Sequence, residues 1–278
     1  MIVLAFHRNA LQTLVSLKSV RVGCVKYLNA RPLIRGWPGN VEFDHPFALC
    51  QRLAKGQLDV ALVSSFEFLR NPIYRIVDDV SMSSDGPVYS VVVAYRGEFS
   101  NIKEIELDPA SETAANLLRC LLAELELTPR LTSHTPESTG SHRARLIIGD
   151  QAIRFRQDHS GEFRFWDLGE EWKKLTGLPF VYALWLIRPE VPDAKSIAQR
   201  LRALRDENVS EIQVVVAEGV ADAADSKQEL TQEFLDRYYN KHLRFGFGTL
   251  EKQALQTFAD LCSKFGVLPK LSREFSLV

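Results

Sequence analysis

Small polar side chains follow several predicted strands of this chain, at the points where those strands end. Asn29 follows a β-branched run, Ser65 follows an apolar run, and Asp150 ends another. Amide, hydroxyl and carboxyl groups can orient a small ligand or exchange a proton with it. In open α/β sheets, ligands bind beyond the carboxyl ends of the strands, so these side chains are candidate ligand contacts. Asn and Ser in such turns more often only cap the following helix, which is the alternative.

The sequence SSDGP at residues 83–87 predicts a turn of fixed shape before an apolar strand expected at residues 88–94. Pro87 restricts its own backbone, and Gly86 can adopt a conformation closed to other residues. The turn places Ser84 at the mouth of a strand, where its hydroxyl can contact a ligand. The alternative is a sharp surface turn that leads into a core strand and holds no ligand.

A predicted helix start near Ser111 offers a third group of donors. Ser111 is the expected N-cap, and Thr113 lies in the first turn. Unpaired amide groups beside two hydroxyls suit a carboxylate. Glu112 in the same turn suits the helix dipole but would repel an anion, so these residues alone favour ordinary capping.

Composition describes an ordinary globular protein and excludes several classes. The 278 residues are 46% hydrophobic, 25% charged and 10% aromatic, with a formal net charge of -1. Basic and acidic residues alternate along the chain, so we expect no nucleic-acid partner. Residues 1–19 contain apolar pieces too short to cross a membrane, and we expect an appendage there and no membrane association. The length favours two domains.

Metal, nucleotide and disulfide motifs are missing from the sequence. The four cysteines are widely spaced and form no CxxC pair, which fits a reducing compartment. No histidine has a second ligand at metal-binding spacing, so we expect no metal. No GxGxxG, P-loop or GxSxG motif occurs, which excludes the usual nucleotide-binding and serine-hydrolase interpretations.

Strand and helix patterns alternate along the chain and predict an α/β fold. A second α/β unit is expected to begin near Arg96, and the chain returns in a long apolar strand at residues 180–187, after a short helix at residues 168–176. The remaining patterns after Pro189 are helical. Other strands are expected at residues 20–25, 41–47, 59–63 and 144–150. The expected division is an appendage at residues 1–19, one lobe from residues 20–95 plus 186–278, and a second lobe from residues 96–185.

Five short segments occur in a fixed order: YLNARP at 27–32, DVALVSSFEFLR at 59–70, SSDGPVYSV at 83–91, LIIGDQAI at 146–153 and DLGEEWKKLTGLPFVYALW at 167–185. Together they resemble the chorismate dehydratase family of the futalosine route to menaquinone, over about residues 20–266. One such motif is weak, but five in register are specific. The resemblance implies an α/β fold like that of type II periplasmic binding proteins, with two lobes, two crossovers and a cleft between them.

The same resemblance implies a cytoplasmic lyase that removes water from chorismate to give 3-[(1-carboxyvinyl)oxy]benzoate, without a cofactor. Because loss of a ring proton and a hydroxyl creates an aromatic ring, the protein need mainly orient its substrate. The family suggests a substrate carboxylate as proton acceptor, with Asn29 and Ser84 as the catalytic residues that hold substrate groups or assist hydroxide departure. The expected substrate contacts, from both lobes, are Ser65, Gly86, Ser90, Ser111, Thr113 and Asp150.

One segment departs from the family pattern. Where the family usually has D-x-S-S-R-T-S, this chain has DPASETA at residues 108–114. Ala110 and Ala114 replace serines, and Glu112 replaces an arginine. An anion in place of a bidentate cation would weaken binding of a dicarboxylate if it faced the ligand. Either Glu112 faces away from the ligand, or the substrate differs.

Three other functions stay open at this level. A sister enzyme, 1,4-dihydroxy-6-naphthoate synthase, shares the implied fold but is expected to have an SPCPND-like opening and a histidine after the third strand, where this chain has KYLNAR and SSFEF. A non-catalytic solute-binding protein would need an export signal or a lipid-anchor cysteine. A diverged relative could act on a different anionic substrate. The oligomeric state is not indicated.

Overall fold

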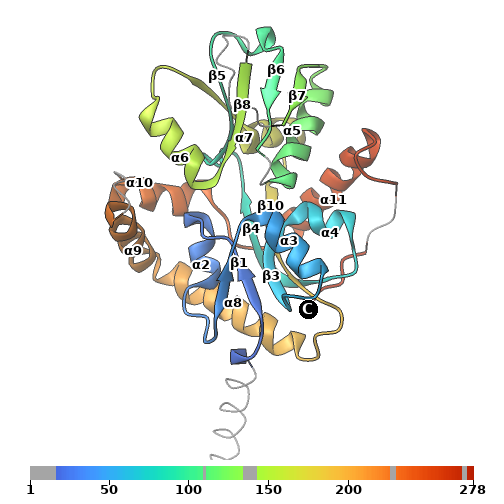
Figure 1. The fold of residues 1–278 in the computed structure, drawn as a ribbon, viewed down its shortest axis with the longest axis vertical. Coiled ribbons are helices and arrows are strands. Elements are labelled where there is room, and N and C mark those ends of the chain that lie inside the picture. Colours follow the sequence, from blue (N-terminus) through green and yellow to red (C-terminus); the bar gives the residue numbers. More distant parts are fainter. Residues whose placement is uncertain (1–16, 109–110, 134–142, 226–229, 271–273) are drawn as a thin grey trace, which may run out of the picture.

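The computed structural model describes residues 17–108, 111–133, 143–225, 230–270 and 274–278. Most of the expected N-terminal appendage lies outside these residues. The described chain folds into two lobes, each built on a five-stranded sheet (Figure 1). Within the described ranges, none of the helices combines the length and the apolar character that crossing a membrane requires.

The first sheet has the strand order β2-β1-β3-β10-β4. Strand β1 pairs in parallel with β2 and β3, whereas β10 is antiparallel to both of its neighbours. Every residue of β3 and β10 is buried, as expected for strands covered on both faces. The strands are β1 (Val22–Cys24), β2 (Val41–Phe43), β3 (Val60–Ser64), β4 (Arg75–Ser84) and β10 (Phe180–Ile187).

The second sheet has the order β7-β6-β8-β5-β9, with β5 antiparallel to both β8 and β9. Strands β6, β7 and β8 are parallel. The chain therefore crosses from one sheet to the other twice, once between β4 and β5 and once between β9 and β10. The strands are β5 (Val91–Tyr95), β6 (Glu104–Glu106), β7 (Arg130–Thr132), β8 (Arg143–Ile148) and β9 (Arg164–Asp167).

The predicted lobe boundaries were wrong at both crossings. Residues 91–95 were assigned to the first lobe, but they form β5 in the second sheet. Residues 180–185 were assigned to the second lobe, but they belong to β10 in the first sheet. An apolar run buried on both faces has the same pattern in either sheet, so only its hydrogen-bonded neighbours decide which sheet it joins.

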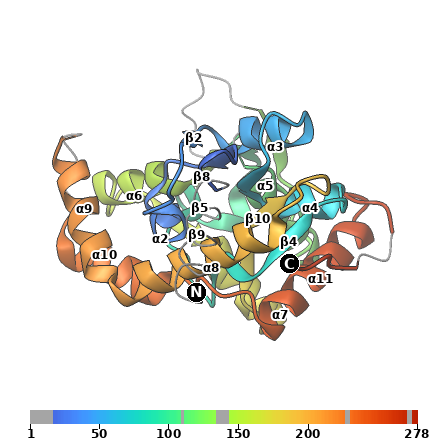
Figure 2. The same ribbon diagram turned by 90° about the horizontal axis from the view of Figure 1, so that it is seen from below.

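Helices cover the sheets and connect the lobes. Figure 1 shows α5, α6 and α7 with the second sheet and α2, α3, α4 and α8 with the first; Figure 2 shows α9 and α10 on one flank and α11 on the opposite one. The helices are α2 (Arg31–Ile34), α3 (Pro46–Ala54), α4 (Ser65–Arg70), α5 (Glu112–Glu124), α6 (Gly149–Asp158), α7 (Leu168–Thr176), α8 (Ala194–Ser210), α9 (Ile212–Asp225), α10 (Gln232–Arg237) and α11 (Thr249–Lys264).

The helix α7 and the strand β10 have the predicted bounds, whereas β4 was missed. Two acidic residues interrupt the apolar pattern of β4, and Asp79 has a positive φ of 63°. The pairing of β4 with β10 shifts register at irregularities along the strand. Because of these interruptions the sequence lacks a clean alternation, and Ser83 and Ser84, predicted in a turn, are the last residues of this strand.

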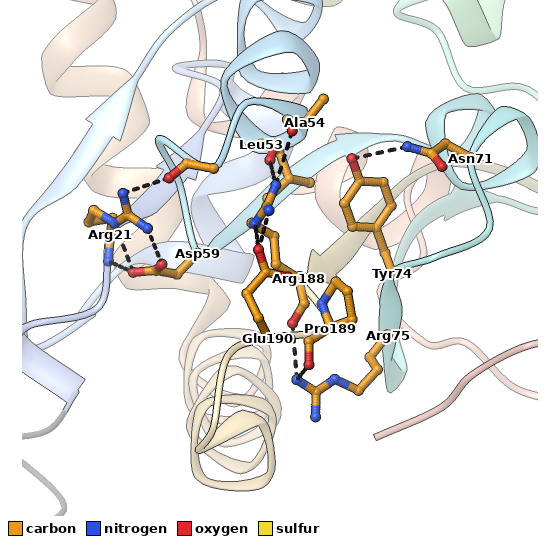
Figure 3. A network of polar contacts seen from close by, with 11 residues as sticks. Arg21, Leu53, Ala54, Asp59, Asn71, Tyr74, Arg75, Arg188, Pro189 and Glu190 are labelled. Carbon is orange, nitrogen blue, oxygen red and sulfur yellow. Dashed lines mark hydrogen bonds and ion pairs between the residues drawn. The ribbon is translucent and has the colours of Figure 1, made fainter.

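A network of arginines fixes the carboxyl end of β10 (Figure 3). Arg188 donates to the carbonyl of Ala54 at the end of α3, at 3.1 Å, and pairs with Glu190. Arg75 of β4 donates to the carbonyls of Pro189, at 2.9 Å, and of Val191, at 2.6 Å. The Ala54 carbonyl is at a helix end and lacks a partner within the helix, so Arg188 supplies one. Together the two arginines join the segment that follows β10 to α3 and to β4.

Candidate functional site

A cavity lies between the two lobes, with about 610 Å³ of empty space that includes a part open to solvent. Its walls come from both sheets. Among the described residues that line it there is no Lys, Arg, Asp, Glu or His. The apolar wall consists of Val25, Pro46, Leu62, Val63, Met82, Val88, Val91, Ile148, Ala183 and Leu243. The polar side chains at the wall are Tyr27, Asn29, Ser64, Ser111, Thr113 and Tyr182.

Asn29 lies in a one-turn 3₁₀-helix, Leu28–Ala30, directly after β1. Its side chain is buried at the cavity wall, and within the described structure its Oδ1 atom has no hydrogen-bond partner. Burial raises the pKa of Tyr238, and a hydrogen bond from the Asn29 side chain partly opposes that rise. The amide nitrogen thus faces Tyr238, and the carbonyl oxygen remains available for a ligand. Asn29 is therefore not a helix cap: the N-cap residues of this turn and of α2 are Tyr27 and Ala30, and neither makes a side-chain capping bond.

Asp150 does not line the cavity; it holds the turn that carries Asn29. Its carboxylate, at the start of α6 in the second lobe, accepts a hydrogen bond from the backbone amide of Leu28 at 3.1 Å. Burial raises the pKa of Asp150 to about 6, against the opposing effects of this amide and of nearby arginines. Next to it, Gly149 has a φ of +60°, and a Cβ there would lie 3.2 Å from the ring of Tyr27. The second lobe therefore contacts this turn closely.

Ser84 also lies one step behind the cavity wall. Its Oγ donates to the carbonyl of Gly86 at 2.9 Å and is 3.1 Å from the Tyr182 Oη. Because a serine hydroxyl has one proton, Tyr182 is then the donor of the second bond. Gly86 has a φ of +108°, the conformation predicted from the turn sequence, and it does not line the cavity. Tyr182, which sequence reasoning missed, is the residue of this pair that lines the cavity.

Asp167 is a buried carboxylate that sequence reasoning also missed. It caps α7 by accepting the amides of Gly169, at 3.1 Å, and Glu170, at 3.2 Å. It also accepts the amides of Val88, at 3.0 Å, and of Tyr89, at 2.8 Å, which has a positive φ of 69°. Burial raises the pKa of Asp167, and these amide bonds oppose the rise. An Asp before a predicted helix signals capping, but its contact with a turn 79 residues earlier leaves no trace in the sequence.

Hydroxyls from the two lobes meet where α4 and α5 begin. Thr113 Oγ1 lies against Ser64 Oγ and accepts the amide of Phe66 at 3.2 Å. Ser111 caps α5, as predicted, by accepting the amide of Ala114. Ser65 does not cap α4; its Oγ donates to a carbonyl of β10 at 2.7 Å, away from the cavity. Ser111 and Thr113 thus reach the cavity, and Ser65 supports the strand beside it.

The structure shows that Glu112, which replaces the family arginine, does not line the cavity. Its carboxylate pairs with Arg70 of α4 at 2.7 Å. Arg70 also pairs with the buried Glu67. The anion that replaces the family arginine is therefore directed to a cation of the other lobe and not to the cavity. Ala110 lies outside the described residues, and Ala114 is buried.

Ser90 is buried behind the wall, where its Oγ accepts the hydroxyl proton of Tyr238 at 2.7 Å. The cavity therefore brings together Asn29, Ser111 and Thr113 from the predicted set. The other five predicted residues lie outside the lining set: Ser65, Ser84, Gly86, Ser90 and Asp150.

Comparison with known proteins finds relatives that match most of this chain. The family model described as menaquinone biosynthesis matches residues 20–264. A protein of Thermus thermophilus named chorismate dehydratase is 27% identical over 259 residues, which cover 86% of this chain and 93% of that protein. A chorismate dehydratase of Campylobacter jejuni is 26% identical over 240 residues, covering 85% and 90% of the two chains.

Solved structures show the fold. The alkanesulfonate-binding protein of Xanthomonas axonopodis superposes with a TM-score of 0.66 and 16% identity, covering 93% of this chain and 97% of that one. The periplasmic aliphatic sulphonate binding protein of Escherichia coli superposes with a TM-score of 0.62 and 15% identity, covering 90% of this chain and 94% of that one. The predicted two-lobed, periplasmic-binding-protein-like α/β fold is thereby confirmed.

Proposed function

The chain belongs to the menaquinone biosynthesis family, whose model spans residues 20–264, and we propose on that basis that it is a chorismate dehydratase. As such it is a carbon–oxygen lyase that converts chorismate to 3-[(1-carboxyvinyl)oxy]benzoate and water. The relatives that bear this name support the proposal. The observation in the molecule that carries it is the buried, unpartnered Oδ1 of Asn29 at the wall of an apolar cavity between the lobes.

Asn29 has the position of a group that orients the substrate. A buried amide oxygen without a partner is costly, and a ligand hydroxyl that donates to it removes that cost. Chorismate has one ring hydroxyl, and this is the group that leaves. Holding that hydroxyl at Asn29 while the ring contacts the apolar wall would fix the substrate in one orientation, which is the main requirement when aromatisation drives the reaction.

The proton acceptor is best sought in the substrate. The described lining residues contain no carboxyl group and no imidazole, so the wall offers no ordinary general base. A carboxylate of chorismate can take the ring proton instead. The departing hydroxide needs a donor, and Tyr182 faces the cavity with Ser84 behind it. Burial raises the pKa of Tyr182 well above its usual value, so its hydroxyl stays neutral, and its proton can serve the departing group by turning from Ser84 toward the ligand.

The substrate carboxylates would be met by uncharged donors. The hydroxyl-bearing residues Ser64, Ser111 and Thr113 line the cavity from both lobes. Hydrogen bonds from neutral donors to carboxylates are strong inside a cavity with an apolar wall. We also propose a cytoplasmic location, which the absence of disulfides among the four cysteines supports.

The test is incubation of the purified protein with chorismate, with product detected by absorbance and mass. Asn29→Ala is expected to lower kcat by about 10²-fold or more, and Ser84→Ala and Tyr182→Phe each by about 10-fold. Asn116→Ala is the matched control, because Asn116 is equally buried, at 6% exposure, but bonds Arg119 and does not line the cavity. Full turnover by folded Asn29→Ala and Ser84→Ala proteins would refute the assignment. Chorismate binding without product would favour the non-catalytic binding protein.

A further inference from the structure

Cys120 and Cys262 face each other across the contact between α5 and α11, 142 residues apart in sequence. Their Sγ atoms are 3.7 Å apart, and neither side chain is exposed. Cys24 and Cys50 are also buried, but the contact between cysteine sulfurs seen in the described part of the chain is the one between Cys120 and Cys262. The described structure thus contains one pair of thiols placed for a joint reaction and two thiols that serve as internal controls.

The pair lies where a helix of one lobe meets a helix that contacts both lobes. Helix α11 packs on β10 of the first sheet and on α5 of the second lobe, and Figure 1 shows it beside α4. Its Phe258 contacts the rings of Phe66 in α4 and Phe180 in β10. The first turn of helix α5 contains Thr113, which lines the cavity. A bond between the two sulfurs would therefore join a cavity-lining helix to a helix anchored in the first lobe.

We propose that Cys120 and Cys262 are a redox-reactive pair that a low-molecular-weight disulfide converts into an intramolecular disulfide. One cysteine, as its thiolate, attacks a sulfur of the small disulfide and releases one small thiolate. The second cysteine thiolate then attacks the mixed disulfide and releases the other. The protein loses two protons and two electrons, and the reagent is reduced to two thiols. A disulfide bond length of about 2.0 Å requires the sulfurs to approach by about 1.7 Å, which side-chain rotation and a small helix shift supply.

Burial makes this reaction depend on movement of the helices. Because both sulfurs are inaccessible, the reagent reaches them only when α5 and α11 separate. Once the bond has formed, it limits how far the same contact can open. Oxidation therefore restricts movement of the second lobe relative to the first, at a place remote from the cavity wall. Reduction of the disulfide restores that movement.

The experiment treats the full chain with oxidised glutathione under native conditions. We expect thiol titration to fall from four to two, the mass to fall by about 2 Da, and peptide mapping without reductant to show Cys120 linked to Cys262. Closing a loop of 142 residues is expected to raise the melting temperature by about 5–10 °C, reversed by dithiothreitol. A Cys24→Ser/Cys50→Ser variant is expected to form the same link.

Retention of all four thiols after prolonged treatment, or a link that involves Cys24 or Cys50, would overturn the proposal. A Cys120→Ala variant is expected to form no intramolecular disulfide, and formation of one would count against it equally. Because Cys120→Ala could destabilise the core, mapping of the unmodified protein is the decisive measurement. These readouts do not depend on chorismate turnover, so failure of the proposed enzymatic function would leave their meaning unchanged.

Discussion

Asp150→Asn is expected to stabilise the protein at neutral pH and to remove part of the pH dependence of its stability. The carboxylate is held at the start of α6, where it accepts the amide of Leu28 at 3.1 Å. Burial raises the pKa of Asp150 from 3.8 to about 6, although that amide and the charges of Arg31 and Arg154 oppose the rise. Asparagine has the same shape, and its Oδ1 can accept the same amide without a buried charge.

The sign and size of the effect follow from the raised pKa. A carboxyl whose pKa is higher in the folded than in the unfolded chain favours folding at low pH, where both states are protonated. That contribution is lost as the pH rises through the folded pKa of about 6. A rise from 3.8 to about 6 corresponds to about 3 kcal/mol in total. When the pH rises from 5 to 8, ionisation of Asp150 lowers the free energy of unfolding of the unmodified protein by about 1.4 kcal/mol.

Urea unfolding of both proteins at several values between pH 5 and pH 8 measures this difference. We expect Asp150→Asn to be more stable by up to about 3 kcal/mol at pH 8, and its advantage to shrink by about 1.4 kcal/mol at pH 5. The control is Asp158→Asn, because Asp158 lies in the same helix but is exposed. If the Asp150→Asn protein were the less stable one at pH 8, or if the difference did not vary with pH, the assigned burial of this carboxylate would be wrong.

Three further substitutions test the contacts around the cavity. Gly169→Ala would place a Cβ 2.5 Å from a backbone carbonyl, and we expect urea unfolding to show a loss of about 1–3 kcal/mol, whereas Gly246→Ala, in open space, should change little. Asp167→Asn puts an amide nitrogen where an oxygen accepts backbone amides, so the melting temperature should fall by about 5 °C or more. Arg70→Met leaves the buried Glu67 without its cation and should lower the free energy of unfolding by about 3 kcal/mol, and an unchanged free energy of unfolding would contradict this reason.

Local patterns were sufficient for most elements and for the order in which they occur. The apolar run of β10 and the amphipathic turn of α7 were predicted with the bounds that the structure has. The capping of α5 by Ser111 was also predicted, because a cap depends only on residues within one turn. Strand β4 was missed, since its acidic interruption is compensated by pairing with β10, which comes about 100 residues later.

The candidate site was predicted as a region but not as a set of contacts. Asn29, Ser111 and Thr113 were expected at the ligand and do line the cavity, and their roles toward a substrate stay predictions. Ser84 was expected there too, but Tyr182 lies between it and the cavity. The turn sequence indicates where Ser84 is, yet a partner 98 residues away decides which hydroxyl faces the ligand.

The sequence by itself determined most of the α/β element order, the glycine-dependent turn at Gly86 and the family, because these depend on spacing along the chain. Only the tertiary structure decided that Glu112 pairs with Arg70, that Asp150 holds the turn of Asn29, and that the Asn29 carbonyl oxygen remains without a partner in the described structure. The physical reason is that these side chains belong to different lobes. Their energies are set by partners and burial that exist only after the two sheets have packed together.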